Sequence, residues 1–143
     1  MARLKLTIPS QFSFTTNIPV RITDVNYGGH VGNDAILSII HEARMQYLHQ
    51  SGYSEINFEG VGLIMSDVAI DFKNEVFYGD TITAHVIAND FSKVGFDISY
   101  KLEKIKDDKT VTVALAKTGM VCYDYQARRI AAVPEAAIQK LTV

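Results

Sequence analysis

The 143-residue sequence contains one cysteine, no long apolar run and no excess of charge of either sign. Cys122 has no partner for an internal disulfide, which is typical of a protein in a reducing compartment. No apolar segment approaches the roughly 20 residues that a membrane-spanning helix needs, and the first residues lack the apolar core of a signal peptide. We therefore expect a cytoplasmic protein that does not enter a membrane.

Charge and composition exclude further classes. The formal net charge is −2, and no basic run marks a nucleic-acid-binding surface. The chain has no internal repeat, low-complexity tract or linker between domains. Hydrophobic residues make up 48% of the sequence, which is enough to bury one core. We expect a single domain spanning residues 1–143, with no nucleic-acid partner.

The longest helical pattern covers residues 34–51. Apolar residues recur there at helical spacing and leave little polar surface, namely Ile36, Leu37, Ile39, Ile40, Ala43, Tyr47 and Leu48. A helix this apolar is normally buried. Asn33 or Asp34 is expected to cap its start by accepting a backbone hydrogen bond, and Gly52 ends the pattern.

The other segments alternate apolar and polar residues, which predicts strands. The expected strands cover residues 12–22 (interrupted by Pro19), 63–73, 82–88, 96–103 and 110–125. Residues 106–109 form a hairpin turn by composition, Gly119 marks a bulge or a close approach, and Pro134 suits the first turn of a short terminal helix. Short links indicate antiparallel neighbours. The prediction is an α+β fold in which a curved antiparallel sheet of about five strands wraps one long helix.

Several familiar sites are not supported. The four histidines, at positions 30, 41, 49 and 85, do not have the spacing of metal ligands, so no metal site is expected. Cys122 lies within a strand pattern, where a buried small side chain is more common than a nucleophile. Gly28, Gly29 and Gly32 match neither a phosphate-binding loop nor a dinucleotide fingerprint. No metal or organic cofactor is therefore predicted.

Asp24 is the first candidate for chemistry because it follows the first expected strand and precedes the glycine-containing loop that leads to the helix. Backbone amides at a helix start can bind a developing oxyanion. A carboxylate facing such a site can attack an acyl carbon or activate a water molecule. The alternative is that Asp24 only stabilises a turn, as most loop aspartates do.

Glu42 is the second candidate carboxylate, one or two turns inside the expected helix. A catalytic or substrate-orienting role is one possibility. The others are a pairing with an arginine or a helix-end dipole, or an exposed side chain at the open flank of the helix. The sequence leaves these alternatives open.

Three segments resemble the hotdog-fold acyl thioesterases of the 4-hydroxybenzoyl-CoA thioesterase type. Residues 24–34 read DVNYGGHVGND and are followed by HEAR at 41–44, residues 76–83 read VFYGDTIT, and residues 120–134 read MVCYDYQARRIAAVP. The segments occur in the family's order and cover nearly the whole chain. Gly32 departs from the pattern, because many members have an asparagine at that position.

The resemblance implies a hotdog fold and homodimers or homotetramers whose sheets join edge to edge and share active sites. It also implies a thioesterase that hydrolyses a fatty or aromatic acyl-CoA, or a similar acyl-carrier thioester, to the acid and the free thiol. Asp24 matches the catalytic aspartate, a nucleophile or general base according to the member. Val31 matches the position whose amide polarises the thioester carbonyl.

Further residues are expected to contact the substrate. His30, Gly32 and Asn33 belong to the matching motif, while the phosphates of CoA need basic partners, for which Lys93, Arg128 and Arg129 are candidates. Each of these three cations has solvated surface charge as its alternative. Two other functions also stay open on this fold: an acyl-thioester binder or dehydratase/isomerase-like enzyme that does not hydrolyse, and a structural or regulatory domain in which Asp24 is a turn residue.

Overall fold

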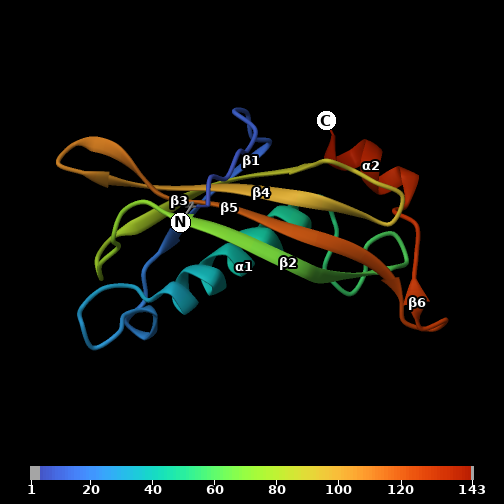
Figure 1. The fold of residues 1–143 in the computed structure, drawn as a ribbon, viewed down its shortest axis with the longest axis horizontal. Coiled ribbons are helices and arrows are strands. Elements are labelled where there is room, and N and C mark those ends of the chain that lie inside the picture. Colours follow the sequence, from blue (N-terminus) through green and yellow to red (C-terminus); the bar gives the residue numbers. More distant parts are fainter. Residues whose placement is uncertain (1–3, 143) are drawn as a thin grey trace.

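A computed structural model describes residues 4–142 (Figure 1). The elements in order are β1 (Phe14–Pro19), the 3-10 turn η1 (Ile22–Asp24), α1 (Asn33–Gln50), β2 (Gly62–Phe72), β3 (Thr81–Asn89), β4 (Gly95–Lys106), β5 (Lys109–Asp124), β6 (Arg129–Ile130) and α2 (Glu135–Leu141). Within this part of the chain, no helix has the length and apolar character needed to cross a membrane.

The strands form one antiparallel sheet in the order β1-β3-β4-β5-β2, and the two-residue β6 pairs with β5. The predicted antiparallel sheet and its single long helix are therefore confirmed. The β2 strand pairs with β5, which comes much later in the sequence. The sheet thus has β1 at one edge and β2 at the other.

The helix α1 lies against one face of the curved sheet (Figure 1). Ile36, Ile40, Ala43 and Tyr47 are between 0% and 3% exposed, as their spacing predicted. The Tyr47 hydroxyl accepts a hydrogen bond from the amide of Ala88 in β3 at 3.1 Å. Burial of this apolar stripe is the main favourable contribution to joining helix and sheet.

The expectation that α1 leaves little polar surface is wrong. Ser38, His41, Glu42 and His49 are exposed on the side of the helix that faces away from the sheet. The apolar residues gather on one side instead of surrounding the helix, because positions three and four apart share a face. One side of α1 therefore remains open to solvent or to a partner.

The predicted helix caps are partly wrong. Gly32 is the N-cap, without a side-chain hydrogen bond, and Asn33 and Asp34 are the first two helical residues. Their amides already belong to the first turn, so their side chains are one or two positions too late to act as the N-cap. The other end follows the prediction, since Gly52 has a φ of 82° just after the helix. In α2, Pro134 is the N-cap, one position before the first turn.

One strand prediction needs correction, and the prediction for Gly119 is confirmed in one of its two alternatives. The first strand ends at Pro19, and the predicted continuation through residue 22 instead leaves the sheet and enters η1. The irregularity predicted at Gly119 lies on the facing strand, where the register shifts between Met65 and Asp67. A Cβ at Gly119 would collide with the side chains of Asp67 and Ser66. Gly119 is therefore a point of close approach, and the extra residue is in β2.

The buried stripe of α1 gives a test of the fold. Ile40 is 0% exposed, so Ile40→Ala removes apolar contacts and leaves a cavity that should lower the free energy of unfolding by roughly 2–5 kcal/mol. Urea unfolding of the variant and the parent measures this difference. Ile56→Ala is the matched control because Ile56 is 84% exposed. Equal losses in the two variants would contradict the packing of α1 against the sheet.

Candidate active site

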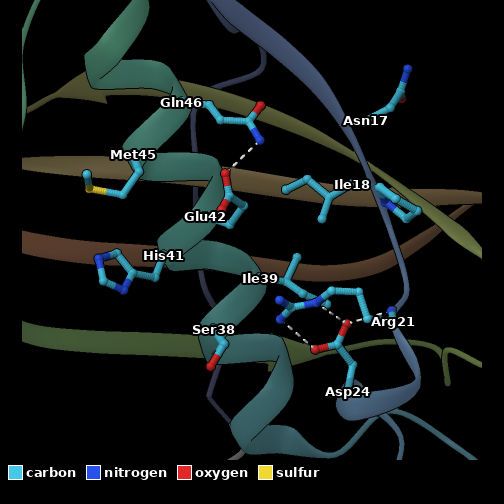
Figure 2. Close-up of a pocket in the computed structure, with 11 residues that line it drawn as sticks. Asn17, Ile18, Arg21, Asp24, Ser38, Ile39, His41, Glu42, Met45 and Gln46 are labelled. Carbon is cyan, nitrogen blue, oxygen red and sulfur yellow. Dashed lines mark hydrogen bonds and ion pairs between the residues drawn. The ribbon is translucent and has the colours of Figure 1, made fainter.

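Asp24 is the last residue of η1, and Arg21 comes just before this turn. The turn joins their backbones, since the Asp24 amide donates to the Arg21 carbonyl at 2.9 Å. The Asp24 carboxylate in turn accepts hydrogen bonds from the Arg21 amide at 2.8 Å, Nε at 3.4 Å and Nη2 at 3.0 Å. The three-residue separation therefore places a guanidinium directly on the predicted catalytic carboxylate (Figure 2).

The two members of this ion pair differ strongly in exposure. The side chain of Asp24 is 4% exposed and that of Arg21 is 69% exposed. Burial acts to raise the pKa of Asp24, but the hydrogen bonds and positive charge of Arg21 outweigh it, so the pKa lies below its ordinary value. Asp24 is consequently a buried carboxylate that remains ionised at neutral pH.

Asp24 and Glu42 line the same cavity, of about 380 Å³, between β1 and the exposed flank of α1 (Figure 2). We call it the flank cavity. Its walls combine apolar and polar side chains, and they consist of Asn17, Ile18, Pro19, Arg21, Asp24, Ser38, Ile39, His41, Glu42, Met45 and Gln46. The fold thus brings together the two carboxylates that the sequence suggested, one from a loop and one from the helix.

Glu42 is exposed and has a different partner from Asp24. Gln46 Nε2 donates to Glu42 Oε2 at 2.7 Å, one helical turn along α1. The Thr16 hydroxyl of β1 donates to Gln46 Oε1. The neighbouring Arg44 points away from Glu42, with its Nε 3.7 Å from Glu55 Oε1. Arg44 is therefore not the arginine partner of Glu42, and the exposure of Glu42 agrees with the alternative of an exposed side chain at the flank of the helix.

His30, Val31 and Asn33 line a second cavity, of about 290 Å³, at the start of α1. We call it the helix-start cavity, and its other lining residues are Ile36, Phe72, Lys73, Asn74, Glu75, Val76 and Val113. Asp24 does not line it, so Asp24 and the motif residues of the helix start line two different cavities. A Cβ at Gly32, the N-cap, would lie 2.6 Å from Asp34 Oδ1, so the exposed Asp34 side chain would have to move to admit a larger residue.

The Val31 amide is not free to bind a carbonyl oxygen. It donates to the Val76 carbonyl at 2.8 Å, so the donor expected at this position is already engaged within the chain. The first intrahelical bond runs from the Ile36 amide to the Gly32 carbonyl. The amides of Asn33, Asp34 and Ala35 precede it and lack helical acceptors. These three are the donors at the helix start.

The loop that holds Val31 is fixed by a buried lysine. Lys104 Nζ donates to the Glu75 carbonyl at 2.7 Å and to Asp80 Oδ2 at 2.9 Å. Asp80 Oδ2 also accepts the Phe77 amide at 2.9 Å, and Phe77 forms a backbone bridge with His30. The Tyr-Gly-Asp segment that contributed to the family resemblance therefore anchors the motif loop and does not reach into either cavity.

The three predicted basic partners lie elsewhere. Arg129 begins β6 and Arg128 precedes it, while the Lys93 carbonyl accepts the Val133 amide at 2.9 Å. In Figure 1 the β6 strand is at the right end of the molecule and the start of α1 is at the left. Within the chain these cations are not brought together with Asp24, His30 or Asn33.

Cys122 and the histidines give no competing site. Burial raises the pKa of the Cys122 thiol to about 11, so it is protonated at neutral pH and a poor nucleophile. Among residues 4–142, no three His, Cys, Asp or Glu side chains are grouped to bind a metal ion. The carboxylates of the flank cavity are the groups best suited to chemistry.

Sequence reasoning missed three residues of this site: Arg21, Gln46 and Thr16. Two of them left a signal, since Arg21 precedes Asp24 by three residues and Gln46 follows Glu42 by four, a separation at which helical side chains meet. Thr16 left none, because its contact with Gln46 depends on how β1 lies beside α1.

Comparison with known proteins places these features in context. Residues 20–141 match the family described as the thioesterase-like superfamily. A 1,4-dihydroxy-2-naphthoyl-CoA hydrolase from Nostoc punctiforme is 30% identical over 132 residues, covering 90% of this chain and 86% of the relative.

Solved structures confirm the hotdog fold. A 1,4-dihydroxy-2-naphthoyl-CoA thioesterase from Synechocystis has a TM-score of 0.79 and 23% identity, covering 90% of this chain and 95% of the other. A 4-hydroxybenzoyl-CoA thioesterase from Pseudomonas sp. strain CBS-3 has a TM-score of 0.78 and 17% identity, covering 91% and 99%. A thioesterase-superfamily protein from Jannaschia sp. CCS1 has a TM-score of 0.82 and 16% identity, covering 94% and 84%.

Proposed function

The chain belongs to the thioesterase-like superfamily, and we propose that it hydrolyses an acyl-CoA to a carboxylic acid and free CoA. The observation that carries the proposal is the flank cavity, in which an ionised carboxylate, Asp24, and an exposed one, Glu42, lie beside the first turns of α1. A carboxylate can attack a thioester carbon or activate a water molecule without a metal. No cofactor is needed, because a thiolate is a good leaving group.

The reaction breaks the bond between the acyl carbon and sulfur and forms one to oxygen. If Asp24 acts as base, it takes a proton from the attacking water, and the departing thiolate accepts a proton. If it acts as nucleophile, an acyl-aspartate forms first and water then releases the acid. We propose the amides of Asn33, Asp34 and Ala35 as donors to the negative oxygen of the intermediate, which requires the thioester to reach from the flank cavity toward the start of α1.

We propose an aromatic acyl group as the first substrate class to test, with fatty acyl groups second. The named relatives from Nostoc and Synechocystis act on 1,4-dihydroxy-2-naphthoyl-CoA, and the Pseudomonas protein acts on 4-hydroxybenzoyl-CoA. The flank cavity has apolar walls from Ile18, Ile39 and Met45 beside its polar groups, which suits an apolar acyl group. CoA as carrier is favoured over a carrier protein by the same relatives.

We also propose that two copies pair through β2, with homotetramers as a further step. The β2 strand has 11 residues and lies at the edge of the sheet. Its exposed apolar side chains include Ile64, Val68 and Phe72, at 40%, 39% and 46%. A long apolar edge of this kind is normally paired or covered.

Pairing through β2 would also explain the remote cations. In an antiparallel pair, the start of one β2 lies beside the end of the other. The start of β2 pairs with β5 at Tyr123, which also pairs with β6. The end of β2, at Phe72, lines the helix-start cavity. Arg128, Arg129 and Lys93 of one copy would then approach the helix-start cavity of the other and meet the CoA phosphates.

Acyl-thioester binding without hydrolysis is the second candidate function. It is favoured by the ion pair of Asp24 with Arg21, which occupies three of the carboxylate's acceptor positions. We propose the cytoplasm as the location under either function. The single, buried Cys122 is compatible with that compartment.

A panel of acyl-CoAs with a thiol-reactive dye separates the two functions. If the protein is a hydrolase, at least one aromatic or fatty acyl-CoA should release free CoA at a rate proportional to the enzyme concentration. Binding measured by calorimetry on the same panel, with no thiol released from any member, would establish the non-hydrolytic function instead.

Asp24→Asn tests the carboxylate. Asparagine keeps the size of the side chain but cannot act as base or nucleophile, so kcat should fall by about 10²–10⁴-fold. The KM and the unfolding midpoint should change little, because Arg21 is exposed to solvent and tolerates the loss of its partner. Asp107→Asn, in the exposed turn between β4 and β5, is the matched control. Activity of Asp24→Asn within a few-fold of the parent would remove Asp24 from the mechanism and leave Glu42.

The assembly is tested by light scattering at micromolar concentration, where a dimer or tetramer is expected. Val68→Lys places a charge on the β2 edge and should shift the protein toward monomer. Ile105→Lys, at a residue of β4 that is 65% exposed, should leave the mass unchanged. A monomeric parent protein would refute the pairing and the sharing of cations between copies.

A further inference from the structure

Among the described residues, the hydrogen bonds to the Asp24 carboxylate come from one residue, Arg21. A carboxylate has about four acceptor positions on its two oxygens. The amide and Nε of Arg21 both donate to Oδ2, and Nη2 donates to Oδ1. One position, on Oδ1, remains without a hydrogen-bond donor among the described residues. Arg21 therefore decides which lone pair of the carboxylate is available.

The surroundings make this dependence strong. Asp24 is buried and Arg21 is exposed. Loss of the guanidinium would therefore leave the carboxylate with the Arg21 backbone amide as its one donor among the described residues, unless water entered the site. The other charged or titratable groups that line the cavity are His41 and Glu42 of α1. Glu42 is negative and disfavours a second negative charge nearby. Arg21 is the one arginine or lysine among the described lining residues, so its charge favours the ionised form of Asp24 at every pH near neutral.

We propose that Arg21 is a positioning residue for Asp24, which keeps the carboxylate ionised and turned so that one Oδ1 lone pair stays open for water or the acyl carbon. The inference deepens the proposed thioesterase function and rests on it for its catalytic meaning. The contact between Arg21 and Asp24 itself does not depend on whether the protein is a thioesterase. A lysine in the same place would supply charge without the planar fork that binds both oxygens.

Arg21→Gln and Arg21→Lys test the inference kinetically. In Arg21→Gln, burial still opposes ionisation of Asp24 while its cationic partner is gone, so the pKa of Asp24 rises and the acid limb of the kcat/KM profile moves to higher pH. At pH values below that limb, the kcat/KM of Arg21→Gln should be roughly 10- to 100-fold lower than that of the parent, the loss typical of hydrogen bonds to a charged group. The fall should lie in kcat, with KM unchanged, and Arg21→Lys should recover part of it.

Lys109→Gln is the charge-matched control, because Lys109 is exposed at the start of β5. It should leave the profile in place. An acid limb that does not move in Arg21→Gln, with Arg21→Lys no different from Arg21→Gln, would overturn the proposal. Unfolding midpoints of all variants separate this result from general destabilisation.

A readout without substrate keeps the inference separate from the proposed function. The carboxyl carbon of Asp24, assigned with Asp24→Asn, can be titrated by NMR in the parent and in Arg21→Gln. Its midpoint should rise in Arg21→Gln, even if no acyl-CoA is hydrolysed. An unchanged midpoint would refute the role of Arg21, whereas a raised midpoint in a protein inactive on every acyl-CoA would refute only the thioesterase.

Discussion

The burial of one apolar side of α1 is the contact on which the other features depend. Ile40 and Ala43 are fully buried against the sheet, which fixes the height of the helix above the strands. That height sets the distance from α1 to β1 and so creates the flank cavity. It also sets where the start of α1 meets the loop before β3, and so creates the helix-start cavity.

Much of this fold could be predicted from local patterns. The alternation of Phe96, Ile98, Tyr100 and Leu102 was enough to define β4, because a half-buried strand needs this period and little else. The start of α1 was predicted less well. Gly32 caps the helix with its backbone alone, and the polar residues after it suggested a side-chain cap that the geometry does not use. Boundaries depend on single φ and ψ angles, which a pattern does not encode.

The site was harder to predict than the fold. Asp24 and Glu42 were identified by residue type and position in the motif, and they do share a cavity. The guanidinium on Asp24 was not foreseen, since it requires η1 where a strand was expected. The distance of Arg128 from the helix start was not foreseen either, because it follows from the register between β2 and β5. Long-range register is set by the packing of the whole sheet, so local sequence carries little information about it.

The position of α1 between two cavities has a consequence for how such a protein can diverge. Ile36 lines the helix-start cavity and Ile39 lines the flank cavity, and the two residues lie three positions apart on the buried face of one helix. A larger side chain at either position presses on the same contact between helix and sheet, so it shifts a wall of both cavities. Changes of selectivity in this lineage should therefore affect both cavities together, and a single substitution at one of these positions should seldom be neutral.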